Sequence, residues 1–235
     1  MKALILNSGL GSRMGVLTKE HPKCMTEIGP GETIVSRQLR MLCDAGVREV
    51  VMTTGVFAEV LQAYCEGLGF PVQIAYVHNP RCRETNYIYS IYLARGELED
   101  DLLLMHGDLV FDRDVLRDML ASRVSCMAVS STVPLPEKDF KAVTDDGLIR
   151  KVGIGFFDSA VAAQPLYFLR KEDWMLWLGK IAEFCEAGNT GVYAENALNE
   201  LDGAAGIRAF DVGTRLCGEI DNPEDLERIR MLLRG

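Results

Sequence analysis

Residues 2–23 read KALILNSGLGSRMGVLTKEHPK. The first five of these residues form an apolar run of strand length, and the small residues after it indicate a turn. A glycine-rich loop after a first strand allows backbone N–H groups to converge on phosphate oxygens. The loop carries the bases Arg13, Lys19 and Lys23 against one acid, Glu20. This pattern predicts a triphosphate site, and the alternative is a surface turn with solvated bases.

Two other nucleotide-binding loops do not fit this spacing. The dinucleotide fingerprint G-x-G-x-x-G runs directly into a helix. Here the third glycine, Gly15, comes one position late, Arg13 lies inside the loop, and no helix pattern begins before about Thr33. In a Walker A loop, four residues separate the first glycine from a Gly-Lys-Ser/Thr sequence. This stretch contains no Gly-Lys-Ser/Thr sequence. An NAD-dependent oxidoreductase is therefore disfavoured.

The composition is that of a globular protein. The chain has 235 residues, of which 48% are hydrophobic and 25% are charged, so a disordered chain is excluded. No apolar run reaches membrane-spanning length, and we expect no membrane insertion. The formal net charge of −9 argues against a large nucleic-acid interface.

The cysteines and the start of the chain indicate a cytoplasmic protein. Seven cysteines without a C-x-x-C pair suit reduced thiols that mostly fill the core, rather than disulfides or a zinc site. The sequence begins Met1-Lys2 and continues as a strand, without a signal-peptide pattern. The three histidines are scattered along the chain, which argues against a His-based metal site.

Strand-length apolar runs alternate with helix-period segments in the first half of the chain. Strands that are apolar on both faces and alternate with helices favour a parallel sheet covered by helices. We predict an α/β fold, a Rossmann-like three-layer sandwich with a mostly parallel central sheet, helices on both faces and a small inserted segment. The predicted strands are 2–6, 47–53, 72–77, 101–106 and 125–131, and the predicted helices are 33–45, 58–65, 86–95 and 115–120.

The second half of the chain has a different pattern. Residues 135–147 are polar and contain proline, and two predicted strands, 148–152 and 165–169, have the character of strands near a sheet edge. An amphipathic helix follows at 171–187, and Asn222 is the predicted N-cap of the last helix. Short strands are predicted at 207–212 and 216–220. We expect one domain, 1–235, composed of a nucleotide-binding core (1–131), an insertion (132–206) and C-terminal strands and a helix that return to the core (207–235).

Four landmarks, in order along the chain, resemble the nucleoside-triphosphate transferases of the sugar-phosphate nucleotidyltransferase type. The loop Gly-x-Gly-Ser-Arg, with Pro-Lys ending ten residues after the arginine, is similar to their signature. Residues 84–93, ETNYIYSIYL, resemble the N-N-I-Y-S-x-Y-L segment of the phosphocholine and 2-aminoethylphosphonate cytidylyltransferase group. Asp108 follows the fourth strand, where the family keeps a metal aspartate. Residues 219–226, EIDNPEDL, resemble the segment that carries the second metal ligand.

The chain also departs from the family pattern. Asn7-Ser8-Gly9 stands where the family usually has Ala-Ala-Gly, and all of these residues are small enough for a nucleotide to approach. Tyr87 replaces the second asparagine of the N-N pair on one side of the base pocket.

The resemblance implies a Mg²⁺-dependent transfer of CMP from CTP to a phosphate-type acceptor, with release of pyrophosphate. Such an acceptor is anionic near neutral pH because its second pKa is about 6, so positioning and electrostatics can carry the reaction without a general base. The implied catalytic residues are Arg13, Lys23 and Asp108, and Asp108 and Asp221 would hold Mg²⁺. By composition alone, Asp221 could instead be a turn residue before the last helix. The implied nucleotide-binding residues are Leu6, Asn7, Ser8, Gly9, Gly11, Ser12, Arg13, Lys23 and Asn86.

The acceptor is inferred from two departures in the insertion. The resemblance implies an aromatic residue that cages trimethylammonium by cation–π contact, and Asp139 takes its place, beside Phe140. Residues 193–196, YAEN, resemble a family Tyr-Trp-Asp-Asn in which the carboxylate is kept. A carboxylate accepts hydrogen bonds from a primary ammonium, whereas a quaternary one has no N–H. We predict 2-aminoethylphosphonate as the favoured acceptor, unless this polar stretch is only a solvated hairpin, with Asp139, Lys141, Tyr193 and Glu195 as acceptor-binding residues.

Three alternatives remain. A phosphocholine cytidylyltransferase that makes CDP-choline differs only in the acceptor, and a sugar-1-phosphate nucleotidyltransferase is disfavoured by the short chain and by residues 86–90. A non-catalytic nucleotide sensor is disfavoured because Arg13, Lys23, Asp108 and Asp221 are all present. The expected partners are CTP and a small phosphate or phosphonate, without nucleic acid. Whether the chain forms a homodimer, which acceptor it uses and how strictly it requires CTP are left open.

Overall fold

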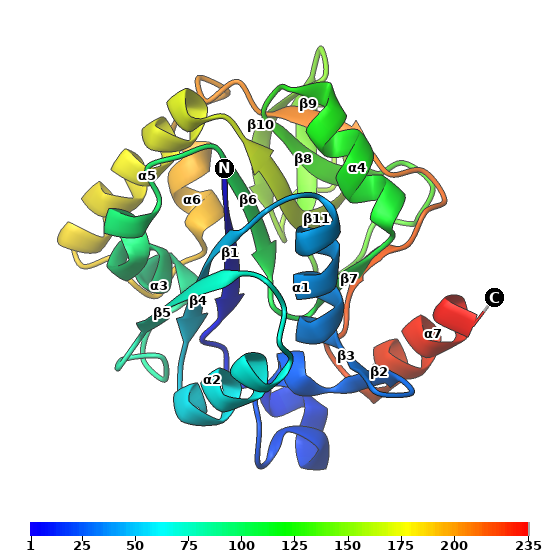
Figure 1. The fold of residues 1–235 in the computed structure, drawn as a ribbon. Coiled ribbons are helices and arrows are strands. Elements are labelled where there is room, and N and C mark those ends of the chain that lie inside the picture. Colours follow the sequence, from blue (N-terminus) through cyan, green and yellow to red (C-terminus); the bar gives the residue numbers. More distant parts are fainter. Residues whose placement is uncertain (235) are drawn as a thin grey trace.

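The computed structural model describes residues 1–234, and a nine-stranded sheet lies at its centre (Figure 1). The strand order is β5-β4-β1-β6-β11-β8-β12-β10-β9. These strands are β1 (Lys2–Asn7), β4 (Glu49–Thr54), β5 (Gln73–His78), β6 (Leu102–His106), β8 (Cys126–Ser130), β9 (Lys141–Asp145), β10 (Leu148–Gly153), β11 (Ala160–Leu169) and β12 (Arg208–Asp211).

Helices and two small two-stranded sheets surround this sheet. The α-helices are α1 (Ile34–Asp44), α2 (Ala58–Gly67), α3 (Tyr87–Ala94), α4 (Arg113–Ser122), α5 (Lys171–Glu186), α6 (Ala194–Asn199) and α7 (Pro223–Arg234), and the 3₁₀ helices are η1 (Ser12–Thr18), η2 (Lys23–Met25) and η3 (Arg95–Glu97). The two-stranded sheets pair β2 (Glu27–Gly29) with β3 (Glu32–Thr33), and β7 (Leu109–Phe111) with β13 (Cys217–Glu219).

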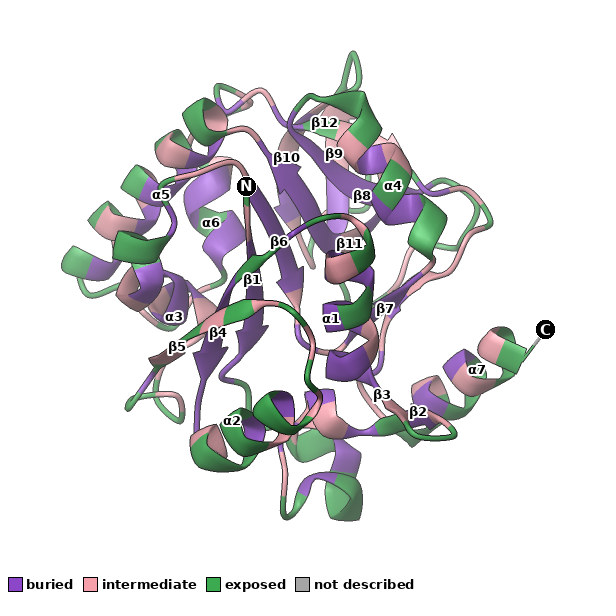
Figure 2. Ribbon diagram, viewed as in Figure 1, coloured by how far each residue is buried: buried purple, intermediate pink, exposed green. Residues whose placement is uncertain are grey.

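The two faces of the sheet pack against different helices, which agrees with the predicted three layers. Side chains alternate along a strand, so Leu4 and Leu6 of β1 face the core under α3, α5 and α6, where Trp177 is buried. Ala3 and Ile5 face the other core, under α1, α2 and α4. Purple buried strands between helices with green outer surfaces show the same layering in Figure 2.

The sheet is mixed, and the prediction of a mostly parallel sheet is corrected. Strands β5, β4, β1 and β6 run parallel, but β11 lies between β6 and β8 and is antiparallel to both. A parallel neighbour requires a long crossover, whereas β11 follows the β9–β10 hairpin through residues 154–159 without an intervening helix. The predicted strand 165–169 is therefore central, and it does not lie at a sheet edge.

Local signals predicted most of the other elements. The last helix begins at Pro223, and the Asn222 side chain accepts the backbone N–H groups of Glu224 and Asp225, as expected of an N-cap. The predicted strand 216–220 corresponds to β13. Strand β9, which forms within the polar stretch, was not predicted, and neither were α6, β2, β3 and β7. All seven cysteines are free thiols. No helix in the described part of the chain is long and apolar enough to cross a membrane.

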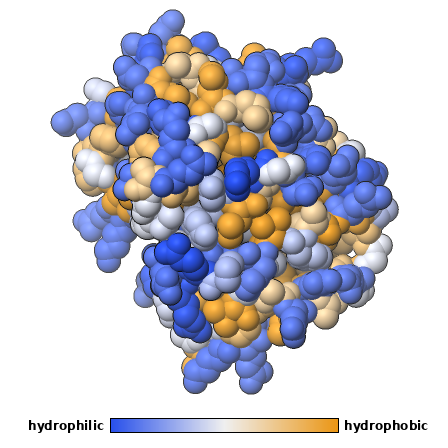
Figure 3. All heavy atoms as spheres, turned by 90° about the vertical axis from the view of Figure 1, so that its left-hand side faces the viewer, coloured by the Kyte–Doolittle hydropathy of each residue, from blue (hydrophilic) through white to orange (hydrophobic). Residues whose placement is uncertain are grey.

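The outer edge of the sheet is partly exposed to solvent. Strand β5 is the edge strand, and its residues alternate between exposed and half-buried positions over most of its length. The face of the molecule on this side, which also includes α3 and α5, presents hydrophilic side chains interspersed with apolar ones (Figure 3).

The pairing of β7 with β13 brings two distant segments to the carboxyl ends of the parallel strands. Open α/β sheets bind ligands at this edge. Glu219 pairs with Leu109, and the Ile220 N–H donates to the Asp108 carbonyl at 3.0 Å. The residues on either side of Ile220 therefore lie next to the end of β6.

Candidate active site

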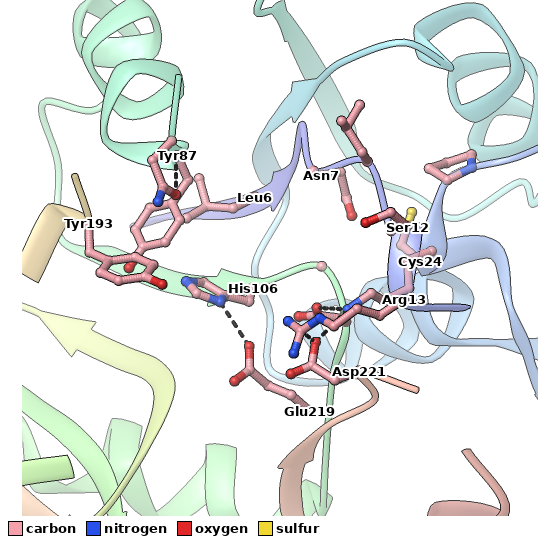
Figure 4. A pocket seen from close by; sticks show the side chains of 18 of the residues that line it. Leu6, Asn7, Ser12, Arg13, Cys24, Tyr87, His106, Tyr193, Glu219 and Asp221 are labelled. Carbon is pink, nitrogen blue, oxygen red and sulfur yellow. Dashed lines mark hydrogen bonds and ion pairs between the residues drawn. The ribbon is translucent and has the colours of Figure 1, made fainter. Parts of the chain in front are cut away.

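A cavity of about 440 Å³ opens at this edge of the sheet (Figure 4). Its wall consists of the loop after β1, the start of α3, the end of β6, and segments from the second half of the chain. The structure brings most of the predicted site residues to this wall: Leu6, Asn7, Gly9, Gly11, Ser12, Arg13, Lys23, Asn86, Asp108, Asp139, Tyr193 and Asp221.

Three predicted site residues do not line the cavity. The buried Ser8 hydroxyl pairs with the Ser90 hydroxyl at 2.7 Å. Lys141 is fully buried at the start of β9, and its ammonium donates to the Pro136 carbonyl of the preceding loop. Glu195 is buried in the first turn of α6. Direct contact of Lys141 and Glu195 with an acceptor, as predicted from the sequence, therefore does not fit this geometry.

Two glycines allow the nucleotide loop to pack closely. Gly11 has φ of +62°, a conformation that other residues rarely adopt. At Gly107, a Cβ would lie 1.7 Å from the Asn7 side-chain oxygen, so no side chain fits there. The loop after β1 can therefore lie directly against the end of β6.

Four charged side chains form a cluster at the centre of the cavity. The Lys23 ammonium donates to Asp108 Oδ2 at 2.6 Å and to Asp221 Oδ1 at 2.8 Å. The Arg13 guanidinium reaches the same Asp221 oxygen at 2.9 Å but is 65% exposed. Burial disfavours the charge of Lys23, but the two carboxylates outweigh this effect and raise the pKa of the ammonium above its ordinary value.

The two aspartates fit the donor set of a hard divalent cation. They converge on one cation, which here is the Lys23 ammonium. The other oxygen of Asp108 is buried and has no hydrogen-bond partner among residues 1–234. Carboxylate oxygens are the ligands that Mg²⁺ prefers, and an unpaired buried oxygen beside a second carboxylate suits such an ion.

A histidine and a glutamate, which the sequence did not predict as site residues, also lie in the wall. His106 Nδ1 and Glu219 Oε1 are 2.9 Å apart. Burial opposes the charged imidazolium, but the hydrogen bond and charge of Glu219 raise the pKa of His106 to about 9. Burial, together with the charge of Asp108, raises the pKa of Glu219 to about 7. At neutral pH His106 therefore carries a proton.

His106, Asp108 and Glu219 form a group whose ligand atoms lie within 4.8 Å of one another, as a metal site would require. The scattered histidines did not reveal this group, because it combines one histidine with two carboxylates, one of them from a distant segment. The signal that could have found the pair is spacing, because His106 and Glu219 each lie two residues before a predicted metal aspartate. Side chains two apart in an extended chain point the same way.

Aromatic rings and carboxylates form another part of the cavity wall. The Phe140 and Tyr193 ring centroids are 5.0 Å apart, and those of Tyr87 and Tyr193 are 5.9 Å apart. Asp139, next in sequence to Phe140, also lines the cavity. Burial, followed by the charges of Asp221 and Asp225, raises the pKa of its carboxyl group. One cavity thus combines bases suited to phosphates with aromatic rings and carboxylates suited to a small cation.

Comparisons with known proteins show the family of the chain. Residues 3–184 match the family model of MobA-like NTP transferase domains. The chain is 33% identical over 180 residues to CMP-5'-(3-aminopropyl)phosphonate synthase of Streptomyces rubellomurinus. The aligned segment covers 73% of this chain but only 28% of that protein's length. The chain is 26% identical over 231 residues to 2-aminoethylphosphonate cytidylyltransferase of Lancefieldella rimae, covering 90% and 92% of the two chains.

A solved structure shares the fold. The inositol-1-phosphate CTP transferase of T. maritima superposes with a TM-score of 0.79 at 22% identity, covering 99% of this chain and 94% of that one. This similarity supports the Rossmann-like α/β fold.

Proposed function

The chain belongs to the family of MobA-like NTP transferase domains, and from this premise we propose that it is a Mg²⁺-dependent cytidylyltransferase that transfers CMP from CTP to a small aminoalkyl phosphonate. The observation that carries the proposal is a single cavity whose wall combines the glycine-rich loop and its bases with aromatic rings and carboxylates. The family membership agrees with the nucleotidyltransferase signature in the first loop.

The glycine-rich loop, with Arg13 and Lys23, suits a nucleoside triphosphate. Backbone N–H groups of Gly11 and Ser12 can donate to phosphate oxygens, and the exposed Arg13 fork can bind the β- and γ-phosphates. Asp108 and Asp221 would hold Mg²⁺, which when bound neutralises charge on the phosphates. Lys23, released from these carboxylates, can donate to the α-phosphate.

The proposed reaction needs no general base. An oxygen of the acceptor, already anionic, attacks the α-phosphorus, and the bond from that phosphorus to the β-phosphate oxygen breaks. Pyrophosphate leaves with the electron pair. The Lys23 ammonium stabilises the charge that develops on the non-bridging oxygens.

Two further carboxylates in the wall favour a primary ammonium. Asp139 and Glu219 line the cavity and can accept N–H···O bonds, which a quaternary ammonium cannot donate. Phe140 and Tyr193 come from residues 132–206, the segment that we assign to acceptor binding. The names of two relatives, an aminopropylphosphonate synthase and an aminoethylphosphonate cytidylyltransferase, support a phosphonate acceptor.

Phosphocholine is the second candidate, because the adjoining rings of Tyr87, Phe140 and Tyr193 could cage a trimethylammonium group. A choline-phosphate cytidylyltransferase of Streptococcus pneumoniae is 23% identical over 243 residues, covering 100% of this chain and 99% of its own. The preferred acceptor depends on which contribution to its binding is larger, the hydrogen bonds from a primary ammonium to carboxylates or the cation–π contacts of a trimethylammonium group with the rings.

A pyrophosphate-release screen tests the proposal. Four NTPs are combined with 2-aminoethylphosphonate, phosphoethanolamine and phosphocholine in the presence of Mg²⁺. We expect CTP to be used and the primary amine to exceed phosphocholine in kcat/KM by about ten- to a hundredfold, the equivalent of one charge-assisted hydrogen bond. Higher activity with phosphocholine would support the aromatic cage, and no release with any combination would favour a nucleotide sensor.

A further inference from the structure

Glu195 is a buried carboxylate whose side-chain hydrogen bonds come from two tyrosines, and its charge also helps to raise the pKa of His106. It is 1% exposed. One of its oxygens accepts a hydrogen bond from the Tyr167 hydroxyl at 2.8 Å, and the other accepts one from the Tyr87 hydroxyl. Because both oxygens accept, the arrangement is that of an ionised carboxylate.

Such a charge is costly to bury unless something compensates it. Burial and the charge of Glu195 raise the pKa of both Tyr87 and Tyr167 well above the ordinary value, so the hydroxyls stay protonated and donate. A neutral glutamine could link the two hydroxyls equally well. The carboxylate therefore brings something that a purely structural link does not need, which is negative charge directly behind the cavity wall.

Tyr87 connects this charge to the cavity. It is the first residue of α3, and Asn86 caps the helix by accepting the Tyr87 N–H at 2.8 Å. The Tyr87 ring lines the cavity, with its centroid 4.8 Å from that of His106 and beside Tyr193 (Figure 4). One end of the side chain is thus tied to Glu195, while the ring forms part of the aromatic wall.

Tyr167 makes the same bond without reaching the cavity. Its ring is fully buried, and its centroid lies 5.3 Å from that of Trp177 in the core. Of the two tyrosines that donate to Glu195, only Tyr87 has a ring that lines the cavity.

We propose that Glu195 is a positioning residue that acts through Tyr87. It holds the Tyr87 ring in the cavity wall, and its hydrogen bond raises the electron density of that ring, so that Tyr87 binds the ammonium group of the acceptor by a strengthened cation–π contact. This inference rests on the proposed function, because it requires a cationic acceptor. It also gives Glu195 a role in acceptor selection without direct contact.

The test compares 2-aminoethylphosphonate with propylphosphonate, in which a methyl group replaces the ammonium. Tyr87→Phe keeps the ring and removes the hydroxyl, and Glu195→Gln keeps the shape and removes the charge. For each variant we expect the preference for the amine over propylphosphonate in kcat/KM to fall about tenfold, mainly through the KM of the amine. The KM of CTP should change less than about twofold, and the loss of kcat/KM with propylphosphonate should be smaller than the loss with the amine.

Tyr167→Phe is the matched control. It removes the other hydroxyl that donates to Glu195 but leaves the Tyr87 side chain unchanged. It should retain the wild-type preference. Equal effects of Tyr87→Phe and Tyr167→Phe, or equal losses with both acceptors, would reduce Glu195 to a structural link and overturn the inference. If Glu195→Gln does not fold, Tyr87→Phe alone decides.

The proposed function is judged separately, from the wild type. CTP-dependent release of pyrophosphate with the amine supports it whatever the variants do. If phosphocholine is preferred, the same comparison is made with its uncharged carbon isostere. A wild type that turns over neither amine overturns the proposed function and, with it, the inference.

Discussion

Replacing Lys23 by methionine removes the central charge of the cavity while keeping much of the side-chain length. Its ammonium is the only basic group within ion-pair distance of Asp108 among the described residues, and it also contacts Asp221. The variant leaves two carboxylates side by side, with only the exposed Arg13 as a basic partner of Asp221. We expect loss of both stability and turnover.

The expected size follows from burial. Removing one partner of a buried ion pair costs about 3–5 kcal/mol, and since the three side chains are 13–19% exposed we expect a loss near the lower limit. In a chain of this length 1 kcal/mol corresponds to about 2–4 °C in Tm, so Tm should fall by about 6–12 °C. Turnover should fall about 10²–10³-fold, as for other electrostatic donors.

The assay is thermal unfolding at several pH values. The Asp108 pKa, which burial would raise, is lowered by Lys23, and that of Lys23 is raised. The pair therefore stabilises the fold above the ordinary Asp pKa of 3.8 and below the ordinary Lys pKa of 10.5, and this stability is lost as pH falls or rises through the shifted values. The difference between wild type and variant should be largest between these limits.

Metal dependence sharpens the test. At the proposed metal site Lys23 would compete with Mg²⁺ for the two carboxylates, so Mg²⁺ without nucleotide should raise the Tm of Lys23→Met more than that of wild type. Lys19→Met, an exposed lysine of the same loop, is the control and should be neutral. An unchanged Tm at neutral pH in Lys23→Met, or equal stabilisation of both proteins by Mg²⁺, would refute the reasoning.

Two further predictions concern the carboxylates. Asp108→Asn should abolish Mg²⁺-dependent pyrophosphate release with an unchanged circular dichroism spectrum, because the amide keeps the shape but not the charge; wild-type activity that survives EDTA would contradict this. Asp139 has a raised pKa, caused first by burial, so its ionised form costs stability as pH rises. Because Asp139 is exposed, the effect is small. Asp139→Asn should be slightly more stable than wild type at pH 7 and equally stable well below the ordinary Asp pKa of 3.8, with a higher KM for the amine. A variant that is less stable at pH 7 would refute this assignment.

The sequence alone determined the features that depend on neighbouring residues. Apolar periodicity located the strands of the first half and the helices between them, because burial of one face requires a fixed spacing. The glycine loop with Arg13 and Lys23, and the capping role of Asn222, were visible for the same reason. Asp108 and Asp221 were predicted as a pair by resemblance, and the structure places both on Lys23.

Only the tertiary structure decided which distant groups meet and which way side chains turn. The direction of β11 and the pairing of β7 with β13 depend on hydrogen bonds between strands far apart in the chain, which no local pattern encodes. His106 meets Glu219 for that reason. Glu195 turns into the core instead of the cavity because two tyrosine hydroxyls, from α3 and β11, lie within its reach there.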